Sequence, residues 1–300
     1  MKEIYEFRIN PDYENLVPKD WKCKTWSELD FIVKTVTLLK NDPQFEKFSL
    51  LVHEIKIKYG EPLFLGWEIK RVYTRKEIDS AKIFYVDVKA VFEPSGEECE
   101  TKYDENVACA ICGAHRKQLG HLRLKKSSIP KKDISKSIAG EVVASKHLKE
   151  LYEVHNLKGI KFEPIKFKKD SDGFYQPKIF TPKLEISKAT LVGCNPFDFS
   201  EVSKGRVGGK IGSDSFVSKD EVYKCPNGDN IGLNRLSEAY VLNTKAINEF
   251  DFFESRQTTG VKRGLLRPEP LYFCSQNFRK MVVRKGLKGF GFEVAHISDY

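Results

Sequence analysis

Cys109 and Cys112 are the residues whose type and spacing most clearly could do chemistry, because they form a Cys-x2-Cys-Gly turn. Two thiolates three positions apart on such a turn can bind one tetrahedral zinc ion, about 2.3 Å from each sulfur. The surrounding residues are polar and include Gly113, so a cysteine would find little apolar surface to fill there. The spacing therefore predicts a metal site rather than two buried apolar residues or a redox pair.

A tetrahedral zinc site needs two further ligands, and candidates lie close by in the sequence. The expected ligand set, followed by two competitors for its fourth position, is Cys99, Cys109, Cys112 and His115, then His121 or Cys225. A catalytic zinc keeps an open position beside an acid, and neither a His-x-Glu nor a His-Glu-x-x-His motif accompanies this turn. We therefore expect the zinc to be structural.

No other pattern indicates catalysis. The six histidines are scattered, and no Gly-x-Ser-x-Gly motif or close pair of acids accompanies them. The glycine-rich residues 205–212 lack the Gly-Lys-Ser/Thr ending of a phosphate-binding loop. The sequence thus predicts no catalytic residues and a protein that is not an enzyme.

Charge narrows the class of partner. The 300 residues carry a net charge of +9, which favours an acidic partner or nucleic acid but also fits simple solubility. Residues 116–136 are the most basic stretch, with eight Lys and Arg against Asp133 alone. This run contains no aromatic side chain to stack on bases, which weakens the nucleic-acid interpretation.

Cysteine usage and hydropathy indicate the compartment. Seven cysteines are an odd number, which does not suit a secreted disulfide framework. The first residues contain no apolar signal core, and no apolar run approaches the roughly 20 residues that cross a bilayer. We expect a cytoplasmic protein with reduced thiols and no membrane partner.

Local patterns predict the elements of the first ninety residues. Strands are expected at 3–9, 63–73 and 83–92, where bulky and β-branched residues cluster. Helices are expected at 27–39, 45–60 and 74–81, because capping-box spacing or apolar periodicity marks each of them. Farther along, residues 167–182 and 203–218 read as loops.

An internal repeat emerges in the second half of the chain. Shifted by 130 residues, 142–165 aligns without a gap on 272–295, and each segment reads as strand, helix and strand. Six of the 24 aligned pairs are identical: Ser145/Ser275, Leu157/Leu287, Lys158/Lys288, Gly159/Gly289, Phe162/Phe292 and Glu163/Glu293. The serines fall at expected helix N-caps and the glycines between helix and strand.

The repeat extends upstream into the cysteine turn. Asp220-Glu221-x3-Cys225 matches Asp104-Glu105-x3-Cys109, and on this alignment Cys112 and Gly113 face Gly228 and Asp229. Either the second ribbon binds no metal, or Cys225 crosses over to complete the first site. The predicted fold is α+β, with duplicated strand–helix–strand units and a zinc-ribbon-like insertion. The expected segments, within one compact body, are 1–93, 94–166 and 167–300.

These motifs resemble those of the double-CxxCG proteins. The Cys-x-x-Cys-Gly turn lies upstream of a Val-Val-Ala-Ser-x-x-Leu-x-x-Leu helix and a Gly-x-x-Phe-Glu-Pro strand, and the resemblance covers about residues 80–300. Such proteins are similar to immunity proteins of bacterial polymorphic-toxin systems. The resemblance implies a non-enzymatic binder that neutralises a cognate toxin. The second motif, at Cys225, departs from the family pattern.

Two interpretations of function thus stand side by side. The first is the immunity-type protein, whose contact residues we expect among exposed aromatic and arginine side chains. The candidates for these contacts are Arg206, Phe216, Phe252, Phe253 and Arg256. The alternative is a zinc-ribbon protein that binds nucleic acid, supported by the ribbon, the net charge and the basic run.

Overall fold

The structure is a computed structural model of mixed α+β class. It describes residues 1–28, 31–168, 173–187, 192–193, 225, 227–231, 234–260, 262 and 264–299. The chain divides into two compact units, Met1–Asp79 and Ser80–Tyr300. Among the described residues, no helix is both long and apolar enough to span a membrane.

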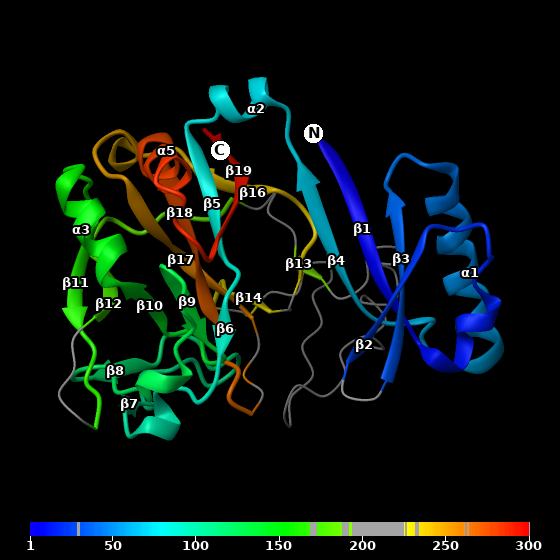
Figure 1. Ribbon diagram of the computed structural model, residues 1–300, viewed down its shortest axis with the longest axis horizontal. Coiled ribbons are helices and arrows are strands. Elements are labelled where there is room, and N and C mark those ends of the chain that lie inside the picture. Colours follow the sequence, from blue (N-terminus) through cyan, green and yellow to red (C-terminus); the bar gives the residue numbers. More distant parts are fainter. Residues whose placement is uncertain are drawn as a thin grey trace. The chain divides into compact units, whose positions relative to one another are not determined.

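The first unit is an antiparallel sheet with a helix packed on one face (Figure 1). Its elements are β1 (Lys2–Ile9), η1 (Pro11–Leu16), β2 (Cys23–Glu28), β3 (Phe31–Leu39), α1 (Pro43–Tyr59), β4 (Phe64–Val72) and α2 (Arg75–Ser80). The strand order is β2-β3-β1-β4. Asp42 caps the start of α1 and Gly60, at φ 76°, ends it. Phe48 of α1 is fully buried, with its ring centroid 4.6 Å from that of Phe7 on β1.

One predicted helix of this unit is wrong. Residues 27–39 carry capping-box spacing, yet they lie in β2 and β3, which form an antiparallel pair. The segment contains Ile32, Val33, Thr35, Val36 and Thr37, and such β-branched residues lose side-chain freedom in a helix and pack well in a sheet. Pairing of β3 with β1 on its other edge adds tertiary support that a short local cap cannot match.

The second unit contains two larger sheets and a small ribbon. Its elements are β5 (Ile83–Val88), β6 (Val91–Phe92), η2 (Glu97–Cys99), β7 (Lys102–Asp104), β8 (Lys117–Leu119), η3 (Lys126–Ser128), β9 (Ile134–Ser137), β10 (Val142–Ser145), α3 (Lys146–Val154), β11 (Ile160–Pro164), β12 (Phe174–Ile179), β13 (Val192–Gly193), β14 (Asn230–Ile231), β15 (Asn234–Arg235), β16 (Ala239–Leu242), η4 (Lys245–Asn248), β17 (Phe252–Gly260), β18 (Glu269–Ser275), α5 (Gln276–Arg284) and β19 (Phe290–Ser298). The division of the chain precedes β5, whose two neighbours in its sheet are β18 and β19. The segment predicted at 1–93 therefore extends past the first unit, and 94–166 and 167–300 both lie in the second.

The two larger sheets share an order over five strands. One sheet runs β11-β12-β10-β9-β6 and the other runs β19-β5-β18-β17-β14, with β16 added beside β19. In each sheet the first three pairings are antiparallel and the last, β9 with β6 or β17 with β14, is parallel. The strand β12 lies in a segment predicted to be a loop, and it pairs with both β10 and β11.

Both helices of this unit begin in the same way. Ser145 Oγ accepts a hydrogen bond from Leu148 N at 3.0 Å, and Ser275 Oγ accepts one from Phe278 N at 3.2 Å. A strand enters each helix and another leaves it, at residue numbers that differ by 130 for β10 and β18, α3 and α5, and β11 and β19. The predicted strand–helix–strand order is therefore present in both segments.

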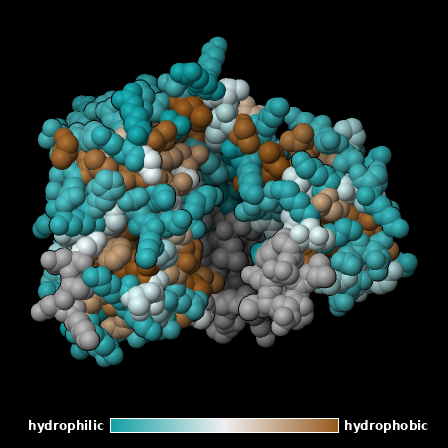
Figure 2. Space-filling view, viewed as in Figure 1, coloured by the Kyte–Doolittle hydropathy of each residue, from teal (hydrophilic) through white to brown (hydrophobic). Residues whose placement is uncertain are grey.

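Buried aromatic side chains form much of the core of the second unit. Phe253 and Phe273 are fully buried in one cluster with Ile83, and Phe278 of α5 packs against Tyr152 of α3 at 6.2 Å between ring centroids. Hydrophilic residues cover most of the face of this unit shown in Figure 2. Surface chemistry is therefore dominated by polar groups.

Candidate metal centre

The Cys109 turn lies between β7 and β8 of the two-stranded ribbon. Cys109 N donates to Ala114 O at 2.8 Å, and Gly113 N donates to Cys109 O at the same distance. Gly113 adopts φ 72°, a left-handed conformation that glycine enters at low cost. This turn brings the sulfurs of Cys109 and Cys112 to the same side of the backbone, as the predicted metal turn requires.

A second turn at Cys225 has the same closing bonds but is one residue shorter. Cys225 N donates to Asp229 O at 2.7 Å, and Gly228 N donates to Cys225 O at 2.8 Å. Gly228, at φ 95°, therefore takes the place of Gly113. The alignment of Gly228 with Cys112 is thus corrected, because the second turn lacks the residue that would carry its second cysteine.

The two turns bring three cysteines together. The sulfur atoms of Cys109, Cys112 and Cys225 all lie within 4.8 Å of one another. Cys109 Sγ and Cys225 Sγ are 3.6 Å apart, although 116 residues separate them in the sequence. Ligands on a tetrahedral zinc ion with bonds of about 2.3 Å lie about 3.8 Å apart, so the sulfur spacing fits one ion between them.

Backbone donors make Cys109 the most acidic of the three thiols. Burial alone would raise its pKa, but hydrogen bonds from the backbone of Cys112 and Ile111 and from Asn227 Nδ2, 3.2 Å away, bring the pKa down to about 7. Burial raises the pKa of Cys112 and of Cys225. The turn therefore favours a thiolate at Cys109.

Asp229 places a buried carboxylate beside this cluster. It is 2% exposed, and its Oδ2 lies 3.7 Å from Cys112 Sγ. Its Oδ1 accepts hydrogen bonds from Thr258 N at 2.8 Å and from Thr258 Oγ1 at 3.1 Å. His115 Nε2 lies 3.0 Å from the same oxygen. A buried carboxylate with these fixed partners can act as an oxygen ligand or orient a neighbouring one.

The predicted ligands divide between two places. Cys109 and Cys112 are in the cluster, and His115 contacts it through Asp229. Cys99 is not among the clustered cysteines but lies at the end of η2, beside a separate hollow. Cys225, considered only as a competitor, supplies the third thiol, whereas His121 is exposed and outside the cluster.

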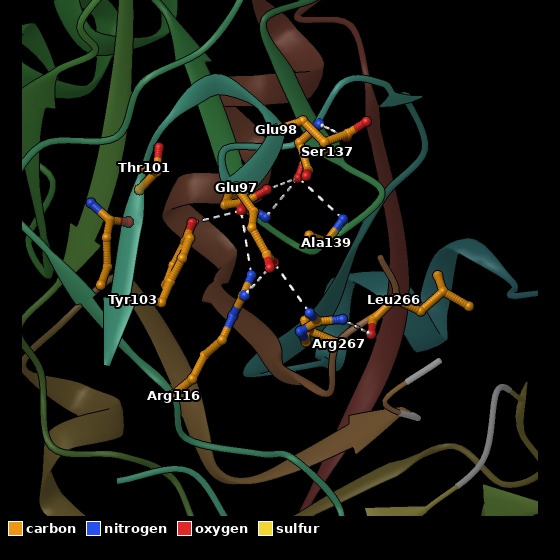
Figure 3. Close-up of polar contacts among 12 residues, drawn as sticks. Glu97, Glu98, Thr101, Tyr103, Arg116, Ser137, Ala139, Leu266 and Arg267 are labelled. Carbon is orange, nitrogen blue, oxygen red and sulfur yellow. Dashed lines mark hydrogen bonds and ion pairs between the residues drawn. The ribbon is translucent and has the colours of Figure 1, made fainter. Parts of the chain in front are cut away.

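Arg116 anchors the base of the ribbon next to this centre (Figure 3). Its guanidinium carbon lies 3.7 Å from the ring centroid of Tyr103, and its Nη1 forms ion pairs with Glu97 at 2.8 Å and Glu105 at 3.3 Å. Glu97 also pairs with Arg267 at 3.1 Å. These contacts fix β7, β8 and the chain before β18 to one another.

A buried serine and glutamate lie at the back of this network. Tyr103 OH donates to Glu141 Oε1 at 2.6 Å, and Ser137 Oγ is hydrogen-bonded to the same carboxylate. Burial raises the pKa of Tyr103 and the negative charge of Glu141 raises it further, so Tyr103 is a donor at neutral pH. Ser137 is fully buried, which bars a substrate from its hydroxyl. These residues position the ribbon rather than serve as a nucleophile and base.

The candidate contact residues do not form one exposed group. Phe252 and Phe253 are buried in the core, so their assignment to an exposed contact surface is wrong. Arg256 is half exposed and pairs with Glu185 at 2.7 Å. Arg206 and Phe216 lie outside the described residues.

The double-CxxCG resemblance thus rests on the turn and on the strand–helix–strand segments. A scan of protein-family models and a search of curated proteins return no match to this chain.

Proposed function

We propose that this chain is a non-enzymatic immunity-type protein, held together by a structural zinc ion, that binds and neutralises a cognate bacterial toxin. The observation that carries the structural role of the metal is the 3.6 Å contact between Cys109 Sγ and Cys225 Sγ. A metal bound there would join two turns far apart in the chain. Binding free energy of such a site is folding free energy, since the ligands are scattered in the unfolded chain.

The donor set favours zinc. Three thiolates suit a soft or borderline ion, and structural zinc sites are closed by four protein ligands. Asp229 is the fourth ligand in this proposal, because its Oδ2 lies beside Cys112 Sγ and its own position is fixed by Thr258. His115 then orients the carboxylate through its contact at Oδ1.

We infer that the body of the second unit is an internal duplication. Equal strand order, equal pairing sense and an offset of 130 residues support this inference. In each repeat the first strand, β5 or β12, lies in the sheet of the other repeat. The cysteine turns then occupy corresponding positions, with the second turn reduced by one residue.

The duplicated body suits a binding protein. A specific inhibitor needs a rigid surface of roughly 800 Å² on its own side. Exchange of β5 and β12 between the sheets ties the halves together, and a metal at Cys109 and Cys225 would tie them a second time. With a net charge of +9, we expect the toxin to be acidic or neutral at its contact face.

Co-expression with the toxin encoded beside this gene tests the proposal. The chain should protect the host cell and co-purify with the toxin in a one-to-one complex. A Cys225→Ser chain should protect less well, because it loses the staple, and a Cys99→Ser chain should protect fully. If the isolated protein modifies a substrate, and one polar substitution abolishes that turnover, the proposal is wrong.

A further inference from the structure

A broad hollow on the second unit lies apart from the cysteine cluster. It has a volume of about 940 Å³, within the range of sites that take small molecules and cofactors. Its walls come from residues 94–100 around η2, residues 123–127 at η3 and residues 166–168 beyond β11. Segments from three parts of the chain thus enclose one space.

Backbone hydrogen bonds hold these walls in place. Leu124 N donates to Lys166 O at 3.2 Å, and Lys166 N donates to Leu122 O at 2.9 Å. Thr101 Oγ1 accepts from Arg123 N at 2.8 Å and donates to Arg123 O at 3.1 Å. Leu122 and Leu124 are buried beneath them in a core cluster. The side chains that line the hollow therefore project from a fixed frame.

The hollow is strongly positive. Its basic side chains are Arg123, Lys125, Lys126, Lys166 and Lys168. Two acids, Glu98 and Glu100, share the lining, and Glu98 already accepts a hydrogen bond from Ser95 N at 2.7 Å. In the part of the chain that the structure describes, Arg123 forms no ion pair, whereas Arg116 and Arg235 each do. Exposed cations without a carboxylate partner suit an anionic ligand.

An aromatic ring completes the lining. Phe167 is half-buried and packs edge-on against Phe174, with 6.4 Å between ring centroids. Lys126 Nζ lies 5.9 Å from the Phe167 ring centroid. The basic run 116–136 contains no aromatic residue, so the fold supplies from β11 and beyond what that run lacks. Cations that bind phosphate beside a ring that stacks on a base are the combination by which proteins bind nucleotides in single strands.

We propose that this hollow binds a nucleotide unit, with its phosphate on Arg123 and the neighbouring lysines and its base against Phe167. The unit belongs either to a free nucleotide or to a single-stranded nucleic acid. This inference does not rest on toxin neutralisation, since it depends on other residues and another surface.

Binding of two probes tests it. Fluorescence anisotropy at low salt would follow a labelled twelve-residue oligothymidylate and, separately, a fluorescent analogue of ATP. The double variant Arg123→Gln, Lys166→Gln should weaken binding of the probe about tenfold and flatten its salt dependence. The matched control, Arg284→Gln with Lys285→Gln, removes the same charge from exposed positions at the end of α5 and should change binding less than twofold.

Two further measurements separate nucleotide recognition from simple attraction of charge. Phe167→Leu keeps every cation and should weaken binding about tenfold through lost stacking. Bound probe should also slow alkylation of the half-buried Cys99, read by mass spectrometry. Saturable binding of the oligonucleotide alone identifies a single strand as the ligand, and binding of the ATP analogue identifies a free nucleotide. The proposal is overturned if neither probe binds, if the control pair weakens binding equally, or if polyglutamate competes as well as the oligonucleotide.

Discussion

Gly289 lies directly against the carbonyl oxygen of Ile134. A Cβ atom added to Gly289 would stand 2.1 Å from that oxygen, and the glycine adopts φ 100°. The corresponding residue of the other segment, Gly159, would place a Cβ 2.5 Å from the carbonyl oxygen of Phe252, at φ 119°. In each case the chain between helix and strand in one half touches the first residues of a strand in the other, so the halves can only approach this closely with glycine.

Gly289→Ala should therefore be strongly destabilising. The neighbouring backbone must move and the residue must hold a left-handed conformation, which together cost about 2–5 kcal/mol of the free energy of unfolding. Gly120→Ala is the matched control, because Gly120 has φ 78° and nothing within 4 Å of the added carbon. It should cost about 1–2 kcal/mol. Urea denaturation measures both, and equal losses would show that crowding at Ile134 is unimportant.

A pair of aspartates links the two halves reciprocally. Asp133 Oδ2 accepts a hydrogen bond from Lys288 N at 2.7 Å and Asp251 Oδ2 accepts one from Lys158 N at 2.9 Å. Each aspartate also accepts from the serine that caps the helix of its own half, Ser145 at 3.1 Å and Ser275 at 2.6 Å. One carboxylate thus fixes a helix start and the crossing of the partner half.

Asp133→Ala and Asp251→Ala should each lower the free energy of unfolding by about 1–3 kcal/mol, because each leaves a backbone donor and a serine hydroxyl without their acceptor. Asp299→Ala, which removes an exposed contact to Asn243 Nδ2 at 3.0 Å, should cost less than about 0.5 kcal/mol. Chemical denaturation of the three variants measures the difference. A cost at Asp251 no larger than that at Asp299 would contradict the linking role.

Local signals were enough to predict the helices of both halves. Ser145 and Ser275 are N-caps in the structure as the sequence indicated, and α1 lies where its apolar period predicted a helix. The same kind of signal failed at residues 27–39, where β-branched residues and pairing with β1 outweigh the capping box. The strand β12 was missed because Pro177 lies in its middle, and a proline argues against a strand unless its missing donor is not needed.

The third cysteine could not be assigned from sequence alone. Cys99 is close to Cys109 in the chain, whereas Cys225 is 116 residues away, and closeness in sequence was the stronger guide. Spatial proximity of Cys225 depends on how the two halves associate, which no local pattern encodes. The repeat alignment did give a usable signal, since it placed Cys225 opposite Cys109.

Metal analysis of the purified protein should find one zinc ion per chain. Cys225→Ser should lose that zinc and unfold at a lower temperature, because the site contributes to folding. Asp229→Ala should weaken zinc binding, since its carboxylate lies against Cys112. Cys99→Ser is the control and should retain the full zinc content. Loss of zinc from Cys99→Ser with retention in Cys225→Ser would restore the ligand set expected from the sequence.

Arg116→Lys should loosen the ribbon although it keeps the positive charge. The arginine side chain is 8% exposed, stacks on Tyr103 and pairs with three carboxylates, those of Glu97, Glu105 and Glu141. Lysine offers neither the planar fork nor the stacking face, so the variant should lose about 2–3 kcal/mol of stability.

Because the substitution lies next to His115, zinc should also dissociate faster from the Arg116→Lys chain, measured by transfer to a coloured chelator. Arg75→Lys is the control, as its side chain is 95% exposed and pairs with Asp79 at 3.5 Å. It should cost less than about 0.5 kcal/mol and leave zinc release unchanged. If Arg116→Lys releases zinc at the rate of the unaltered chain, the network beneath the ribbon does not hold the cysteine turn in place.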